Sequence, residues 1–191
     1  MKARLCVVSA LYRRGFQVLD LGGRLVLGSG RETVAVTRRN LTLRNAYVRG
    51  ARLMVREAGS GLRLENVVFE GPCDVTDSEG GLVGVVQVHA ARDVRVRKCR
   101  LSGGGTACCG LYVADGAQVL VAESECRDNR AWGVFATGAG TKVALLDSNL
   151  DSNATGASTV RHGARVAWEK GGAATTTLTG AGSQVYLACA S

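Results

Sequence analysis

Proline, histidine and aromatic residues are scarce in this chain of 191 residues. It has one proline, Pro72, two histidines and only 5% aromatic residues. Because 26 glycines accompany that single proline, the composition excludes collagen and proline-rich linkers and leaves Gly, Asn, Asp and Ser to form the turns. The 46% hydrophobic and 21% charged residues also exclude a disordered tail and a coiled coil. The composition therefore predicts one folded, turn-rich β domain.

Long hydrophobic runs are absent as well. No stretch approaches the roughly 18 apolar residues that a membrane-spanning helix requires, so we expect no membrane contact. The apolar stretch from Leu5 to Leu11 follows two basic residues but lacks the small-residue cleavage site of a secretory signal. Leu5, Val8 and Leu11 have helical spacing. We therefore expect residues 1–15 to form a short helical cap and residues 16–191 to form the domain.

The seven cysteines lack the spacing of a metal site or a disulfide framework. No Cys-x-x-Cys pair occurs, the number is odd, and Cys108 and Cys109 are adjacent. We expect reduced, mostly buried thiols and an intracellular, reducing, cytoplasmic location, with a virion component as the open alternative. Neither a metal nor a cofactor is expected.

Basic residues are concentrated in the first third of the chain. Residues 1–63 hold 13 Lys and Arg and three Asp and Glu, whereas residues 64–191 hold 11 and 13. Arginine suits anionic partners, although a solvated β surface carries arginines without any ligand. Since no aromatic residues interleave with the surface columns expected of Arg44, Arg63, Arg95 and Arg97, the pattern disfavours nucleic acid as a partner.

A ten-place pattern recurs five times along the chain. Its first, third and eighth places are apolar, its fifth is polar, and its tenth is Gly, Asp or Ser. Apolar residues two apart indicate a short strand, because successive side chains point to opposite faces. The polar fifth place then predicts a turn, and the apolar eighth place begins the next strand. The five copies start at Leu41, Leu62, Val94, Val119 and Val143.

The spacing of the copies indicates a solenoid. Successive starts are 21, 32, 25 and 24 residues apart, and repeats of this length bury their apolar faces only by stacking. Three strands per coil predict an all-β, right-handed parallel β-helix of about seven coils. Val185–Leu187 either closes the last coil or pairs with another chain. The third strand of each coil is expected at Leu53–Val55, Val86–Val88, Leu111–Val113, Val134–Ala136 and Ser158–Val160.

The stretch from Cys126 to Asn153 contains a Gly-Val-x-Ala strand at Gly133, a Val-x-Leu strand at Val143, and turns with Asn129 and Asn153. This stretch resembles the repeat of the pectin-lyase-like right-handed β-helix superfamily, and the resemblance covers about residues 18 to 187. Members of that superfamily include polysaccharide-cleaving enzymes, viral tail-spike domains and non-catalytic adaptor domains. The resemblance therefore implies the fold and leaves the chemistry open.

The superfamily's enzymes bind substrate across the outside of the third strands. Cleaving a polysaccharide there requires paired carboxylates, or carboxylate-bound calcium with an arginine base. The period of two directs Ala35, Met54, Gln87, Tyr112, Phe135 and Thr159 outward in one row, with Thr37, Arg56, His89, Ala114, Thr137 and Arg161 beside it. Neither row contains an acid, which weighs against an enzyme. Tyr112 and Phe135 should stack on adjacent coils about 4.8 Å apart.

These rows give the expected function. We expect a non-catalytic structural or binding solenoid that presents an outward face to a protein or polysaccharide partner. The alternatives are a carbohydrate-active enzyme, either a polysaccharide lyase or a glycoside hydrolase, acting on the same face, and a subunit of a viral or other large assembly, with homo-oligomers open. His89 is the single, weak candidate for acid-base catalysis. The expected binding residues are Met54, Arg56, Gln87, His89, Tyr112, Phe135 and Arg161.

One insertion, from Gly71 to Gly84, accounts for the 32-residue spacing. Its acids Asp74, Asp77 and Glu79 are weak candidates for calcium, because they lack the Asp-x-Asp-x-Asp-Gly spacing of a strong site. We expect a plain solvated loop there.

Overall fold

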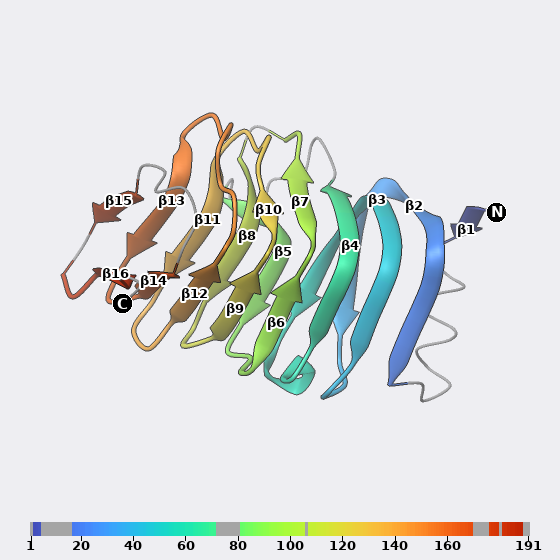
Figure 1. Ribbon diagram of the computed structural model, residues 1–191, viewed down its shortest axis with the longest axis horizontal. Coiled ribbons are helices and arrows are strands. Elements are labelled where there is room, and N and C mark those ends of the chain that lie inside the picture. The colour runs from blue at the N-terminus through green and yellow to red at the C-terminus, as the bar shows by residue number, and fades with distance from the viewer. Residues whose placement is uncertain are drawn as a thin grey trace.

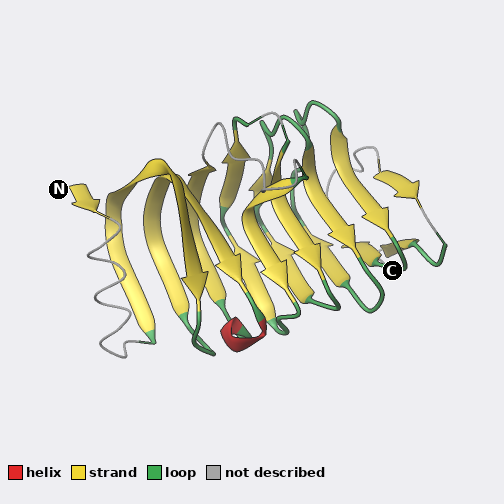
Figure 2. Cartoon of the chain, turned by 180° about the vertical axis from the view of Figure 1, so that it is seen from behind, coloured by secondary structure: helices red, strands yellow, loops and turns green. Residues whose placement is uncertain are grey.

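The computed structural model describes residues 2–4, 17–71, 81–105, 107–169, 176–179 and 181–188. In these residues the regular structure consists of sixteen β-strands and one short 3-10 helix, η1 (Glu57–Gly59), the single red turn in Figure 2. The strands wind into a parallel β-solenoid of about six turns (Figure 1). The predicted all-β solenoid is confirmed, with about one turn fewer than expected. The strands are β1 (Lys2–Arg4), β2 (Val18–Val36), β3 (Thr42–Val55), β4 (Arg63–Gly71), β5 (Val83–His89), β6 (Val94–Arg97), β7 (Arg100–Gly103), β8 (Cys108–Ala114), β9 (Gln118–Ala122), β10 (Glu125–Cys126), β11 (Trp132–Thr137), β12 (Lys142–Leu146), β13 (Gly156–Arg161), β14 (Arg165–Glu169), β15 (Thr176–Thr179) and β16 (Gln184–Ala188).

Three parallel ladders form the sides of the solenoid. The first face contains the C-terminal part of β3 followed by β5, β8, β11, β13 and β15. The second face contains the beginnings of β3 and β4 followed by β6, β9, β12, β14 and β16. The third face contains the middle of β3, the end of β4, β7 and β10. The long strand β2 pairs with β3 in three stretches, separated by two register shifts.

A left-handed backbone residue forms the corner between the second and third faces. The fifth place of every repeat has positive φ: Asn45 (53°), Asn66 (53°), Lys98 (52°), Glu123 (50°) and Asp147 (44°). This conformation costs an ordinary residue roughly 1–2 kcal/mol, and Asn and Asp adopt it more readily than most. One such residue turns the chain between two short strands, so the turn predicted at this place is confirmed.

The apolar places of the repeat stack into columns inside the solenoid. On the second face Leu64, Val96, Val121, Leu145 and Trp168 occupy one register position on successive turns, and each is at most 5% exposed. Burying a side chain of this size contributes roughly 1.5–3 kcal/mol. Because each residue packs on the turn before it, the stability of one turn depends on its neighbours.

The N-terminal end of the solenoid differs from the expectation, and the C-terminal end agrees with it. Lys2–Arg4 is a strand that pairs in parallel with Leu25–Leu27, so the helix expected to begin in this segment is wrong there. The rest of the expected cap, residue 1 and residues 5–15, lies outside the described residues. At the other end β16 pairs with β14, which confirms that Val185–Leu187 closes the last coil. No helix of the described residues is long and apolar enough to cross a bilayer.

Candidate binding face

The outward row predicted on the first face is present in the strand register. Met54 pairs with Gln87, Gln87 with Tyr112, and Tyr112 with Phe135, each on the next turn. The rings of Tyr112 and Phe135 are stacked, with centroids 5.2 Å apart and planes 5° from parallel. The predicted stacking is confirmed, and the centroid distance is close to the strand spacing of about 4.8 Å.

Two further side chains extend this pair into a column. The His89 ring lies 5.6 Å from the Tyr112 ring at an angle of 31°. At the other end the Arg161 guanidinium lies over the Phe135 ring, 5.2 Å from its centroid. We call His89, Tyr112, Phe135 and Arg161 the stacked column. An exposed cation-π contact contributes roughly 0.5–1 kcal/mol, so the Arg161 contact helps to fix the Phe135 ring.

The members of this face differ in exposure. Phe135 is 5% exposed and Gln87 is 6% exposed, whereas Met54, His89, Tyr112 and Arg161 are half-buried and Arg56 is exposed. Phe135 belongs to a small apolar cluster with Cys109, Ala131 and Trp132, separate from the solenoid core. The stacked rings therefore lie outside the core, as the alternation of side chains predicts.

Trp132 supports this cluster, and sequence reasoning missed it. Its ring lies directly on Gly156, its register partner on β13. A Cβ atom at Gly156 would come within 2.6 Å of the indole Cζ3, so a side chain there would displace the ring. The sequence signal for this contact is a large aromatic residue at a repeat position that a glycine occupies on the next turn.

A polar corner adjoins the stacked column where β5 and β8 end. His89 Nδ1 lies 2.9 Å from Asp115 Oδ2. These two residues, with Arg56, Glu57 and Ala90, line a cavity of about 370 Å³. A carboxylate that holds one imidazole nitrogen orients the ring for proton transfer at the other. Sequence reasoning chose His89 but missed Asp115 as its partner.

The far end of the column has two polar atoms without partners. Thr159 Oγ1 and Arg161 Nε are buried and accept or donate no hydrogen bond within the described structure. Thr159 is the register partner of Phe135, and Arg161 covers the same ring. An unsatisfied buried polar atom costs roughly 1–3 kcal/mol, so these two atoms lower the stability of this end of the column.

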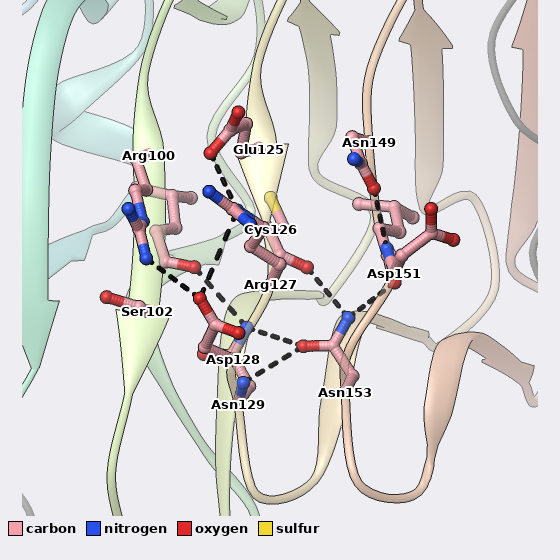
Figure 3. Close-up of polar contacts among 12 residues, drawn as sticks. Arg100, Ser102, Glu125, Cys126, Arg127, Asp128, Asn129, Asn149, Asp151 and Asn153 are labelled. Carbon is pink, nitrogen blue, oxygen red and sulfur yellow. Dashed lines mark hydrogen bonds and ion pairs between the residues drawn. The ribbon is translucent and has the colours of Figure 1, made fainter.

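On the third face, by contrast, the acids are paired with arginines (Figure 3). Asp128 Oδ2 lies 2.8 Å from Arg100, and Glu125 Oε2 lies 2.8 Å from Arg127. Figure 3 also shows Asn153 linking the Asn129 turn to its own turn. Asp128 and Asn153 are engaged in holding neighbouring turns together, and both carboxylates are held by arginines.

The cysteines of the described chain are reduced and buried. They are Cys99, Cys108, Cys109 and Cys126. Burial raises the pKa of Cys99 to about 11 and that of Cys109 to about 12, and it raises the pKa of Cys126 further. Because the thiolate is the reactive form, burial disfavours nucleophilic reaction at Cys99, Cys109 and Cys126.

Metal ligation is also unsupported in the part of the chain that the structure describes. No group of three His, Cys, Asp or Glu side chains gathers there. Asp74, Asp77 and Glu79, the weak calcium candidates, lie outside the described residues.

Comparisons with known proteins identified no relative of the chain. A scan of protein-family models, a search of curated proteins and a search of solved structures each found no match to the chain. The assignment to a parallel β-solenoid therefore rests on the strand register and the core alone.

Proposed function

We propose that the chain is a non-catalytic binding solenoid of the pectin-lyase-like type and that its first face receives a partner. The observation that carries the proposal is the stacked column. Four side chains from different turns are aligned outside the core, and two unsatisfied polar atoms lie at one end. A rigid face of this kind binds with little loss of side-chain entropy. Met54 and Arg56 extend the same face on β3 and directly after it.

The geometry favours a protein partner over a carbohydrate. A sugar packs best against the open face of an aromatic ring. Here one face of Tyr112 meets Phe135, and the His89 ring lies close by on the neighbouring turn. Arg161 covers Phe135. The half-buried Tyr112 ring therefore presents its edge to the outside, which suits the side chains of a protein.

A photo-crosslinking amino acid at position 89 tests this proposal in the cells that produce the protein. We expect covalent adducts with one protein partner, and we expect Tyr112→Ala to reduce them at least fivefold. The matched control is Tyr47→Ala, which truncates another half-buried tyrosine, on the third face. No adduct, or equal loss in both variants, would contradict the proposal. Adducts with glycans would instead support the carbohydrate partner.

The alternative, a carbohydrate-active enzyme, is favoured by the polar corner. A carboxylate-held histidine beside Glu57 provides two groups that can exchange protons within one cavity. The purified protein is incubated with uronate-containing and neutral oligosaccharides, and chain cleavage is followed by mass spectrometry. Cleavage that His89→Ala and Asp115→Asn both abolish would replace the binding proposal by the enzyme. The binding proposal predicts no cleavage.

A subunit of a larger assembly is the second alternative. The outermost strands β15 and β16 each pair with one neighbour within the described chain, so their outer edges can add another strand. Light scattering after size exclusion distinguishes the cases, because an assembly subunit forms oligomers that grow with concentration and a binding module does not. We also propose a reducing, intracellular location, which the four reduced cysteines support.

A further inference from the structure

An open groove of about 670 Å³ lies on the second face, over β6, β9, β12 and β14. Its floor is an apolar row of Leu120, Ala144 and Ala167, which are register partners on successive turns. All three are half-buried, so part of each side chain reaches the surface. The row advances by one strand spacing, about 4.8 Å, per turn.

One edge of the groove is positively charged. Lys142 and Arg165 are register partners on that edge, and Arg92 lies on it ahead of β6. All three are exposed, and none forms an ion pair with a carboxylate of the described chain. Arg95, at the end of the apolar row, is held by Asp93 at 3.0 Å. Cations without carboxylate partners beside an apolar floor attract an acidic, partly apolar ligand.

The other features of the groove exclude several ligand classes. Beyond the lining residues, the exposed acids Asp147 and Glu169 lie just after β12 and at the end of β14, where they repel a uniform polyanion. None of the lining residues is aromatic, so nucleic-acid bases have no stacking partner. An added peptide strand requires an open sheet edge, but β9 and β12 are paired on both sides.

We propose that this groove binds an amphipathic α-helix of a partner protein. The apolar stripe of the helix packs on Leu120, Ala144 and Ala167, and its Asp or Glu side chains face Lys142 and Arg165. One helical turn advances about 5.4 Å, close to the strand spacing, so one apolar side chain meets each turn of the solenoid. The two alanines permit close approach. From Arg95 to Ala167 the row spans three spacings, about 14 Å, which corresponds to roughly ten helical residues. This site is independent of the first face.

Stapled helical peptides of about 12 residues test the proposal by fluorescence anisotropy against the full chain. One peptide carries a Leu stripe flanked by Glu, the second carries the same stripe flanked by Lys, and the third has the composition of the first with the stripe disrupted. A sulfated oligosaccharide and an oligothymidine serve as probes for the two competing ligand classes, anionic carbohydrate and nucleic acid. The groove variant is Lys142→Glu with Arg165→Glu. The control variant, Arg39→Glu with Arg130→Glu, makes the same change of charge at exposed residues outside the groove.

We expect the wild type to bind the Glu peptide in preference to all other probes. The groove variant should weaken this binding by about 10- to 100-fold and gain affinity for the Lys peptide, because the charge complementarity is reversed. The control variant should change the affinity for the Glu peptide less than about threefold. Both variants should have the melting temperature of the wild type. Equal binding of the disrupted peptide, tighter binding of either polyanion, no binding of the Glu peptide, or an equal effect of both variants would overturn the proposal.

Discussion

Replacing Asn153 with alanine removes four hydrogen bonds, three between two turns of the solenoid and one within its own turn (Figure 3). Its Oδ1 accepts from the backbone N of Asn129 at 3.1 Å and from the side-chain Nδ2 of Asn129 at 2.9 Å. Its Nδ2 donates to the carbonyls of Cys126 at 2.8 Å and Leu150 at 2.6 Å. Among the described residues at this corner, no other side chain makes as many hydrogen bonds between the two turns.

The expected loss follows from these four bonds. Each contributes a net of about 1 kcal/mol, and Asn129, which is only 2% exposed, cannot replace its lost partners with water. Asn129 Nδ2 keeps its bond to the Leu101 carbonyl at 3.3 Å, which offsets part of the loss. We therefore expect Asn153→Ala to lower the free energy of unfolding by about 3 kcal/mol.

Asn149→Ala is the matched control. Asn149 is exposed, and its Oδ1 accepts one bond, from the backbone N of Asp151 at 2.8 Å, so its loss should be about 0.5–1 kcal/mol. Urea denaturation at 25 °C, extrapolated linearly, measures both variants, and unchanged m-values confirm comparable transitions. Equal losses in the two variants, or a loss below about 1 kcal/mol for Asn153→Ala, would refute the reasoning.

Two further predictions concern the core. Leu145 is 1% exposed and Leu146, its neighbour on the opposite side of β12, is half-buried, so Leu145→Ala should cost about 2–5 kcal/mol and Leu146→Ala under about 1. Equal costs by urea denaturation would contradict the assigned faces. Because burial raises the pKa values of Cys99, Cys109 and Cys126, a thiol reagent at about pH 8 should modify them only after denaturation. Peptide mass spectrometry checks this, and rapid labelling of the folded chain at these three sites would disprove it.

The repeat was readable from the sequence because its signals are local. An apolar pair two residues apart and a polar fifth place, such as Asn66 or Lys98, define a strand and a corner within ten residues. The stacking of Tyr112 on Phe135 then follows, since the copies align at the same register. Periodicity of this kind needs no knowledge of long-range contacts.

Other parts of the face depend on contacts that no local pattern encodes. His89 and Asp115 are 26 residues apart and meet because His89 ends β5 and Asp115 directly follows β8, the adjacent strand. The first turn was not found as a repeat, because the register shifts after Asp20 and Leu27 interrupt its spacing in β2. The burial of Phe135 depends on Trp132, whose position is set by the glycine on the next turn.

A disulfide cross-link between turns tests the stacked register most directly. Lys142 and Arg165 are register partners on the exposed second face. Adjacent strands lie about 4.8 Å apart, within the range that a disulfide spans. Lys142→Cys with Arg165→Cys should therefore oxidise to an intramolecular disulfide, identified by mass spectrometry of proteolytic fragments. Lys142→Cys with Glu169→Cys, displaced by four residues along β14, should not. Cross-linking of the displaced pair, or none in the registered pair, would contradict the solenoid.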